Sequence, residues 1–400
     1  MSQPFITFEA ELPWIYPLVY ELGSFGPSMA ISLGASSLFL RRRSMSWPYV
    51  YSGDRTKKEL WTYPPGFNRR LGFFFDRPIR AKLNKHIRRL YEQTGKKPYV
   101  ILPNPRLFQY VRDVDPAQLI YLNYDDYSVD FSTGVRLDNP AEDALIHKAR
   151  MVLCASDFQM NRFKERFPSQ KSKVFHFPHG VHSNFINPLP GKSPKGHSVC
   201  VVGWLGSRYD WRLIKEVVTK LKGVTFYFVG EIRRDTFVGE LEFLFKYLED
   251  VLSCKNAIHV PGVKHENTKE YYWKSSINWM PYKIDMPFVK ASCPLKISDG
   301  LASGRQVVSA DVPECRLYPE WISIYHDSIE AVSVIRNALN RSASSKEGER
   351  SLRQISFAAA NTWGQRASWL HSTLETNLTH SMETLVCNST GNVNGQFRSS

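Results

Sequence analysis

The residues best suited to bind an anion lie at the start of a predicted helix over residues 294–303. Pro294 fits the first turn of a helix, where free backbone N–H groups attract negative charge. Next to Leu295, Lys296 adds a positive charge that suits a phosphate. Asp299, one turn further on, can accept hydrogen bonds from the vicinal hydroxyls of a ribose. This spacing predicts a site for a nucleoside diphosphate.

Candidate proton-transfer groups lie in the first half of the chain. Asp125 and Asp126 follow a predicted strand over residues 119–122. Two adjacent carboxylates can raise the pKa of one of them, as a general base requires. The alternative is a turn or helix-capping acid. His179 and His182 are further candidates, although a histidine in a His-Gly-Val turn is more often structural.

The elements that must hold these residues alternate between apolar β-like runs and helical patterns. This alternation is typical of parallel sheets flanked by helices. Strands are predicted over residues 5–8, 99–102, 119–122, 151–155, 173–175, 198–202, 224–229, 257–260, 277–280 and 305–309. Helices are predicted over residues 76–93, 141–149, 157–167, 211–221, 237–251, 268–275, 294–303 and 363–378.

The domain organisation follows from length and from one linker-like segment. A chain of 400 residues favours two domains. Residues 187–197, NPLPGKSPKGH, are rich in proline and glycine and predict a linker. We therefore predict Rossmann-like domains over residues 1–186 and 198–362, a helix over 363–380 that crosses back to the first domain, and a flexible tail over 381–400. In the α/β class, two such doubly wound domains facing across a cleft would bind ligands at the carboxyl ends of their strands.

Positive charge is concentrated in one stretch of the first half. The net charge is +14, and residues 41–97 carry sixteen Lys and Arg against four acids. Residues 76–93 within this aromatic-rich stretch predict an amphipathic helix, with Asp76 as a possible cap. Such a helix suits an anionic membrane surface or a phosphate-bearing ligand, and an ordinary surface helix is the alternative. No nucleic-acid-binding motif accompanies the charge, so we expect no nucleic-acid partner.

Other features bear on location. Residues 22–40 carry no charge and precede three arginines, but nine of these 19 residues are Gly, Ser or Pro. A strand–loop–strand passage is therefore expected rather than a membrane span. The N-terminus lacks a signal-peptide pattern, and the six cysteines include no CxxC pair, which favours a reducing compartment. We predict a cytoplasmic protein, peripheral at the cytoplasmic membrane.

Residues 294–314, PLKISDGLASGRQVVSADVPE, resemble the donor-binding motif of bacterial group 1 glycosyltransferases, PLKLFEYLAAGKPVVATDLPE. Further segments resemble this family in the same order, over residues 176–185, 201–217, 226–231, 259–283 and 361–375. The resemblance implies the GT-B fold of two Rossmann-like domains. It also implies a nucleoside-diphosphate sugar as donor, for which we expect a UDP-sugar.

The resemblance also implies the donor-binding residues. Gly203, Gly206 and Ser207 would lie near the phosphates, and Gly262 and Val263 near the nucleobase. Glu231 would contact the sugar or cap the following helix. The complete implied set is Gly203, Gly206, Ser207, Glu231, Gly262, Val263, Tyr282, Pro294, Leu295, Lys296 and Asp299.

Two departures from the family pattern affect the mechanism. Asp299 stands where the family has its ribose-binding Glu, and Ala291 stands where it has the first Glu of a Glu-x7-Glu pair. These departures do not fit the better-known retaining mechanism. Residues 121–128, YLNYDDYS, are similar to the base-carrying YRASDGLS stretch of the exopolysaccharide enzyme that adds glucuronic acid in xanthan assembly, an inverting GT-B glucuronosyltransferase. That similarity assigns the catalytic base to Asp125.

The resemblance implies transfer of the sugar to a hydroxyl of a lipid-linked or glycan acceptor, without a cofactor. Asp113 and Asp115 resemble the metal-binding Asp-x-Asp of GT-A enzymes, but they lie in a turn before a proline, so we expect no essential metal. Two alternatives stay open. A nucleotide-sugar 2-epimerase shares this fold and would turn over without an acceptor. Ala291 and Asp299 would also fit a non-catalytic nucleotide-binding member.

Overall fold

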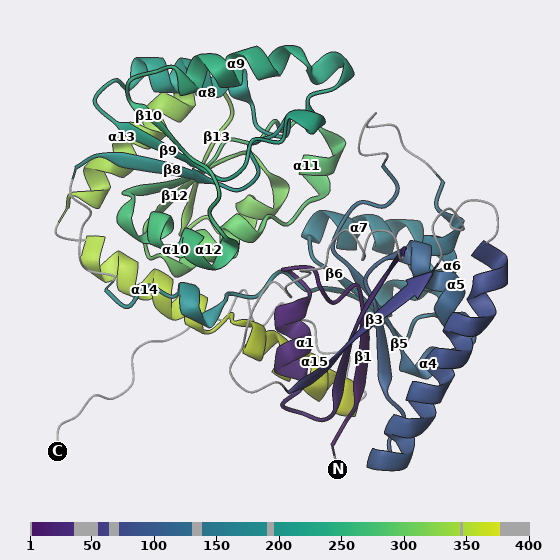
Figure 1. Cartoon of the computed structure of the whole chain (residues 1–400). Coiled ribbons are helices and arrows are strands. Elements are labelled where there is room, and N and C mark those ends of the chain that lie inside the picture. Colours follow the sequence, from purple (N-terminus) through teal and green to yellow (C-terminus); the bar gives the residue numbers. More distant parts are fainter. Residues whose placement is uncertain are drawn as a thin grey trace, which may run out of the picture.

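The computed structural model describes residues 2–35, 55–63, 72–129, 138–189, 196–344 and 347–376. Several predicted features lie outside these residues, namely the arginines at 41–43, most of the linker and the tail over 381–400. The described residues form two α/β domains, each built around one parallel sheet (Figure 1).

The first sheet contains seven parallel strands in the described part of the chain. In chain order they are β1 (Phe5–Phe8), β2 (Ser28–Ala35), β3 (Thr56–Tyr63), β4 (Tyr99–Leu102), β5 (Leu119–Asn123), β6 (Met151–Cys154) and β7 (Val174–His176). Their order in the sheet is β3-β2-β1-β4-β5-β6-β7. The helices of this half are α1 (Tyr16–Leu22), α4 (Gly72–Thr94), α5 (Phe108–Val111), α6 (Pro140–Lys148) and α7 (Asp157–Arg166).

The second sheet contains six parallel strands of the described chain, in the order β10-β9-β8-β11-β12-β13. They are β8 (Ser198–Val202), β9 (Thr225–Val229), β10 (Ala257–Val260), β11 (Ile277–Met280), β12 (Gln306–Ala310) and β13 (Ile322–Tyr325). The helices are α8 (Trp211–Lys220), α9 (Phe243–Leu252), α10 (His265–Lys274), α11 (Pro287–Ala291), α12 (Leu295–Ala302), α13 (Ser328–Ser342), α14 (Glu347–Ala359) and α15 (Trp363–Thr376). Both sheets are doubly wound: the order in which strands are added reverses beside β1 in the first sheet and beside β8 in the second. This confirms the predicted fold class.

Alternate side chains of the central strands enter cores on opposite faces of each sheet. In β4, Val100 and Leu102 join one core while Tyr99 and Ile101 join the other. In the second domain, Val199 and Val201 of β8 face one core, and Cys200 and Val202 face the other. Helices cover both faces, which explains why these strands are continuous apolar runs in the sequence.

The last helix leaves the second domain and packs on the first. Trp363 and Leu370 of α15 share a buried core with Leu18 and Leu22 of α1, and Figure 1 shows the two helices side by side. A second link runs through Glu314, which follows β12. Its buried carboxylate accepts hydrogen bonds from the backbone N–H of Asp157 at 2.8 Å and from Nε2 of His176 at 2.8 Å.

Some elements differ from the prediction. The basic helix begins at Gly72 rather than at residue 76, so Asp76 is a buried residue inside α4 and does not cap it. The predicted helix over 237–251 begins only at Phe243, because two short 3₁₀ turns precede it. Strands β3 and β13 were not predicted. β3 is an edge strand that carries charged residues, so its composition is not apolar.

The uncharged segment over residues 22–40 enters the sheet as β2 in its described part. This agrees with the expected strand passage. Across the described ranges, no helix has both the length and the apolar character needed to span a bilayer.

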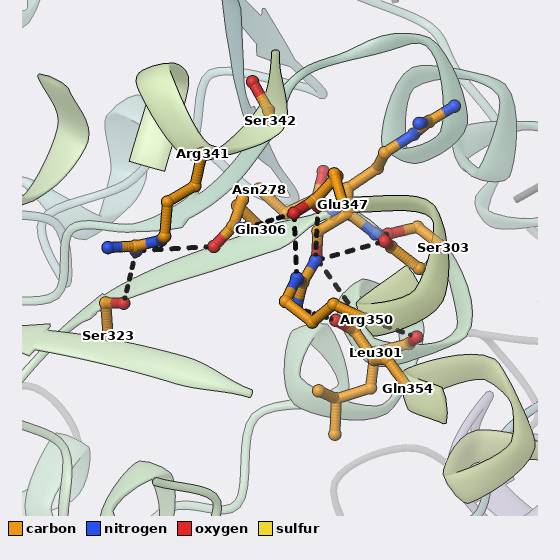
Figure 2. A network of polar contacts seen from close by, with 12 residues as sticks. Asn278, Leu301, Ser303, Gln306, Ser323, Arg341, Ser342, Glu347, Arg350 and Gln354 are labelled. Carbon is orange, nitrogen blue, oxygen red and sulfur yellow. Dashed lines mark hydrogen bonds and ion pairs between the residues drawn. The ribbon is translucent and has the colours of Figure 1, made fainter. Parts of the chain in front are cut away.

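A buried polar network holds the C-terminal end of α12 against α14 (Figure 2). Nε2 of Gln354 donates to the carbonyl of Leu301 at 3.0 Å and to that of Arg305 at 3.1 Å. Glu347 accepts a hydrogen bond from Nε2 of Gln306 at 2.8 Å and pairs with Arg350. Because buried polar groups are costly when unpaired, this network fixes the position of α12.

A substitution of Gly304, in the turn between α12 and β12, tests how closely α14 packs against that turn. Its φ is +69°, and a Cβ atom would overlap Oγ of Ser351 and lie 2.8 Å from Cδ1 of Ile355. We expect Gly304→Ala to lower the free energy of unfolding by about 2 kcal/mol or more, measured by denaturant titration. Gly348→Ala, in α14 with nothing within 4 Å of the added Cβ, is the matched control and should be neutral or slightly stabilising. Equal stability of the two variants would contradict the described packing.

Candidate functional site

A cavity with a volume of about 580 Å³ lies between the two domains. The first domain contributes Pro13 and Trp14, from the segment between β1 and α1, and the second domain contributes the remaining wall. The predicted donor-binding residues that line it are Gly203, Gly206, Glu231, Val263, Tyr282, Leu295, Lys296 and Asp299. Ser207, Gly262 and Pro294 are close in the chain to these residues but do not line the cavity.

The glycines after β8 and β9 allow their loops to approach each other closely. Gly203 has φ +121° and Gly230 has φ +135°, values that disfavour any other residue. A Cβ atom on Gly230 would overlap the carbonyl oxygen of Gly203, and one on Gly203 would lie 2.9 Å from Nζ of Lys296. The two glycines therefore leave the space in which the Lys296 ammonium lies against the backbone.

Lys296 lies in the first turn of α12. Its Nζ donates a hydrogen bond to Oη of Tyr282 at 2.8 Å and lies 5.7 Å from the ring centroid of Tyr209. Pro294 caps the helix with extended backbone, and no side chain caps it. Free backbone N–H groups and a lysine therefore meet at this wall, an arrangement suited to a phosphate group.

Asp299 is buried in the same wall. Its Oδ2 pairs with Nε2 of His265 at 3.1 Å, while Oδ1 has no hydrogen-bond partner among the described residues. A buried unpaired carboxylate oxygen beside a cavity can accept from a ligand hydroxyl. His265 was not predicted. It begins α10 and stacks on Phe185 at 5.0 Å, a contact between segments far apart in sequence.

Glu231 and Ser207 have local hydrogen-bond partners. Oε1 of Glu231 accepts a hydrogen bond from the backbone N–H of Gly262 at 2.6 Å, so Glu231 fixes the loop after β10. Gly262 has φ +72°, as that turn requires. Ser207 is buried, and its N–H donates to Oγ1 of Thr236 at 3.0 Å.

Three further lining residues were not singled out from the sequence. Arg208 follows the predicted Ser207 and lies with its guanidinium 4.0 Å from the ring centroid of Phe288. Trp204 is 65% exposed, and the Arg233 guanidinium lies 4.6 Å from its ring centroid. Trp204 and Arg208 reach the cavity on the short Gly-rich loop after β8. Each lies two residues from Gly206, a predicted donor-binding residue, and this closeness in sequence could have identified them.

The two adjacent acids Asp125 and Asp126 have different environments. Asp126 is buried and accepts two hydrogen bonds from Arg162, at 2.8 and 2.9 Å. Burial alone would raise the pKa of Asp126, but Arg162 outweighs burial and holds that pKa below its usual value. Burial raises the pKa of Asp125 to about 6, against the opposing charge of Arg208 from the other domain. Asp125 is therefore a carboxyl group with a raised pKa, and Asp126 is one half of a buried ion pair.

Neither Asp125 nor Asp126 lines the cavity, and the remaining candidates also lie apart from it. His179 packs against Trp363 at a ring distance of 6.0 Å and lines a smaller cavity with Pro294. Burial lowers the pKa of His179 to about 4, and that of His182 also to about 4, so both imidazoles are neutral near pH 7. Asp113 pairs with Arg80 at 2.6 Å.

The contrasting environments of the two acids can be tested through the pH dependence of stability. The Asp125 pKa is raised on folding from 3.8 to about 6, so its ionisation lowers stability as pH rises between these two values and has a constant effect above them. Asp125→Asn should therefore raise the melting temperature near pH 8, and the gain should shrink toward pH 5. The Asp126 pKa is lowered, so its stabilisation is present above the unfolded pKa and is lost at lower pH. Asp126→Asn should be destabilised near pH 8, and a stabilising effect there would refute its assignment as a structural pair.

The comparisons with known proteins agree with this geometry. No family model matches the chain. Among curated proteins, it is similar to a protein of Bacillus subtilis described as "Putative teichuronic acid biosynthesis glycosyltransferase TuaH", with 27% identity over 180 residues. The alignment covers 43% of this chain and 43% of the relative, so the chain matches less than half the length of that protein.

Three solved structures share the fold. A glycosyltransferase of Rickettsia africae has a TM-score of 0.67 at 10% identity, covering 95% of this chain and 100% of that chain. HepE of Anabaena, in complex with UDP, has a TM-score of 0.65 at 11% identity, covering 94% and 100%. Sucrose-phosphate synthase of Thermosynechococcus elongatus has a TM-score of 0.68 at 14% identity, covering 94% and 99%. The predicted similarity to GT-B glycosyltransferases is therefore confirmed: the chain has the GT-B fold, with two Rossmann-like domains that face each other across a cavity.

Proposed function

We propose that this chain is a glycosyltransferase that moves a sugar from a nucleoside-diphosphate sugar, UDP being the expected nucleotide, to a hydroxyl of a glycan or lipid-linked acceptor. The observation that carries the proposal is the cavity between the domains, where Lys296 and the start of α12 lie against the glycine loop after β8. The relative TuaH is named for teichuronic acid biosynthesis, and HepE was solved with UDP and with UDP-glucose. The name of TuaH agrees with a glycan acceptor, and the HepE complexes agree with a UDP-sugar donor.

The donor would be held by the second domain. Its diphosphate would bind the N–H groups at the start of α12, the ammonium of Lys296 and the guanidinium of Arg208, and these cations would stabilise the leaving group without a metal. Oδ1 of Asp299 would accept from a ribose hydroxyl. The nucleobase would lie by Val263, in the segment that Glu231 fixes.

Asp125 would act as the base from the first domain. With a pKa of about 6 it is ionised near pH 7, yet basic enough to take the proton of an acceptor hydroxyl. The hydroxyl oxygen then attacks the anomeric carbon while the bond from that carbon to the diphosphate oxygen breaks. Attack from the face opposite the leaving group inverts the anomeric configuration.

Nucleotide binding tests the donor site directly. UDP at roughly one hundred times its dissociation constant should raise the melting temperature by about 5 °C or more. Lys296→Ala should weaken UDP binding by about tenfold or more, because it removes a charge-assisted contact. Lys215→Ala is the control, since Lys215 pairs with Asp250 outside the cavity and should leave UDP binding unchanged.

Two outcomes would contradict this proposal. If none of UDP, GDP, ADP and TDP shifts the melting temperature, the chain is not a nucleotide-sugar enzyme. If a UDP-sugar is converted without an acceptor to its 2-epimer, the chain is an epimerase of the same fold rather than a transferase.

The acceptor side would lie at an anionic membrane surface. The outer face of α4 carries exposed Arg77, Lys82, Lys85, Arg88 and Arg89. Figure 1 shows α4 on the side of the first domain away from the second domain, so a bilayer there would leave the cavity free. Long-range attraction of such a basic face to anionic lipid contributes about 1 kcal/mol per residue.

Vesicle binding tests this surface. Changing Lys85, Arg88 and Arg89 together to Gln should weaken binding to phosphatidylglycerol-containing vesicles by about 100-fold, because about 3 kcal/mol of attraction is lost. Changing Lys220, Lys222 and Lys246 of the second domain to Gln removes the same charge from exposed positions and is the matched control. Equal loss in both triple variants, or binding to neutral phosphatidylcholine vesicles, would argue against a specific role for α4.

A further inference from the structure

A second polar cluster lies at the carboxyl edge of the first sheet and does not line the donor cavity. Three strands that are adjacent in the sheet deliver it: Glu9 follows β1, Asn104 lies just after β4, and Tyr124 follows β5. The Glu9 carboxylate accepts hydrogen bonds from Nδ2 of Asn104 at 2.8 Å and from Oη of Tyr124 at 3.1 Å. The order in which strands are added to the sheet reverses between β1 and β4. Doubly wound sheets bind ligands at this position.

The backbone of Glu9 is strained. Its φ is +47°, and it is the one residue other than glycine with a positive φ in the described part of the chain. Glycine would adopt this conformation without cost, whereas glutamate adopts it only where the surrounding structure holds it. Strain of this kind concentrates at binding and catalytic sites, and here it fixes the direction of a carboxylate.

The Glu9 carboxylate has capacity for further hydrogen bonds. Both of the donors named above are neutral, and a carboxylate can accept about four hydrogen bonds. Burial raises the pKa of Glu9, against the opposing effects of Asn104, Tyr124 and the charge of Arg106. The steps assigned above to Asp125 and Lys296 do not use this group.

Aromatic side chains connect the cluster to the donor cavity. Trp14 lines that cavity, and its ring lies 5.7 Å from the ring of Tyr124. The Tyr124 ring in turn lies 5.7 Å from that of Tyr127. Nε1 of Trp14 is buried and has no hydrogen-bond partner among the described residues. Aromatic faces beside a carboxylate and an amide suit a pyranose, whose C–H face is apolar and whose hydroxyls require acceptors and donors.

We propose that Glu9, Asn104, Tyr124 and Trp14 form the subsite for the acceptor, and that the reacting end of the acceptor is a sugar ring with free hydroxyls. Glu9 and Asn104 bind hydroxyls of this ring, and the ring lies against Trp14 and Tyr124. Asp125, the next residue after Tyr124, then reaches the hydroxyl that reacts. This inference rests on the proposed function and narrows its acceptor to a glycan end rather than a bare lipid phosphate.

Direct binding of methyl pyranosides to the full chain tests the subsite. Saturation-transfer NMR with methyl glucoside, galactoside, N-acetylglucosaminide and glucuronide, in the presence of UDP, should detect ring protons of at least one of them. Glu9→Gln and Glu9→Gly should each raise the dissociation constant of that pyranoside by about tenfold or more. Glu9→Gly also relieves the backbone strain, so loss of binding there cannot be attributed to that strain. The exposed Glu92→Gln is the control and should bind normally.

The rise in melting temperature on adding UDP, measured on the same samples, distinguishes failure of the acceptor subsite from failure of the proposed function. Loss of pyranoside binding with an unchanged UDP shift supports the subsite. A wild-type chain that binds UDP but no pyranoside, or a Glu9→Gly variant that binds the pyranoside as tightly as wild type, overturns the subsite and leaves the proposed function standing. Transfer onto farnesyl phosphate in preference to octyl pyranosides also overturns it. A wild-type chain that binds pyranoside but no nucleotide refutes the proposed function, and the pyranoside site is then not an acceptor site.

Discussion

The position of the half-buried Lys296 side chain, whose ammonium lies against the loop after β8, is the constraint on which the donor side of this protein depends. A buried charge is costly unless polar groups or counter-charges surround it. Here Nζ has a hydrogen bond to Tyr282 and lies near the rings of Tyr209 and Tyr282, at 5.7 and 5.3 Å. The absence of a side chain at Gly203 leaves room for it, and the absence of one at Gly230 lets the loop of Gly203 lie close. A bound anion would add a counter-charge beside Nζ, so this geometry suits a diphosphate.

The rest of the second domain keeps α12 in this position. Gln354 and Glu347 of α14 form hydrogen bonds with the C-terminal end of α12 and the start of β12. The N-terminal end of α12 has no side-chain cap. The end that is fixed is the one away from the cavity. A rigid helix with an open N-terminus is preorganised for an anion, which lowers the cost of binding.

Charge is divided between the two domains in a way that fits group transfer. Lys296, Arg208 and Arg233 line the cavity from the second domain, and Asp125 and Glu9 lie on loops at the carboxyl edge of the first sheet. The two sets must approach for a base and a leaving group to act on one sugar. Glu314, which accepts from His176 and Asp157, and α15, which packs on α1, set the distance between the domains.

The sequence by itself determined the elements that are buried on both sides. Strands over residues 5–8, 99–102, 198–202 and 277–280 match the structure because both faces of each are covered, which leaves an apolar run. It also indicated Lys296 and Asp299, because a helix start is a local feature. The edge strand β3 was missed, since its charges suit solvent rather than a core.

Only the tertiary structure decided which side chains meet. Asp125 and Asp126 are neighbours with the same chemistry, and only Arg162, 36 residues further on, makes one of them a structural pair. The His265–Asp299 pair and the Glu9–Asn104–Tyr124 cluster likewise join residues from distant segments. Hydrophobic periodicity records which way a side chain points within its own element. It carries no information on which loops lie together at the same edge of a sheet. The side chains that these loops bring together determine the chemistry of this site.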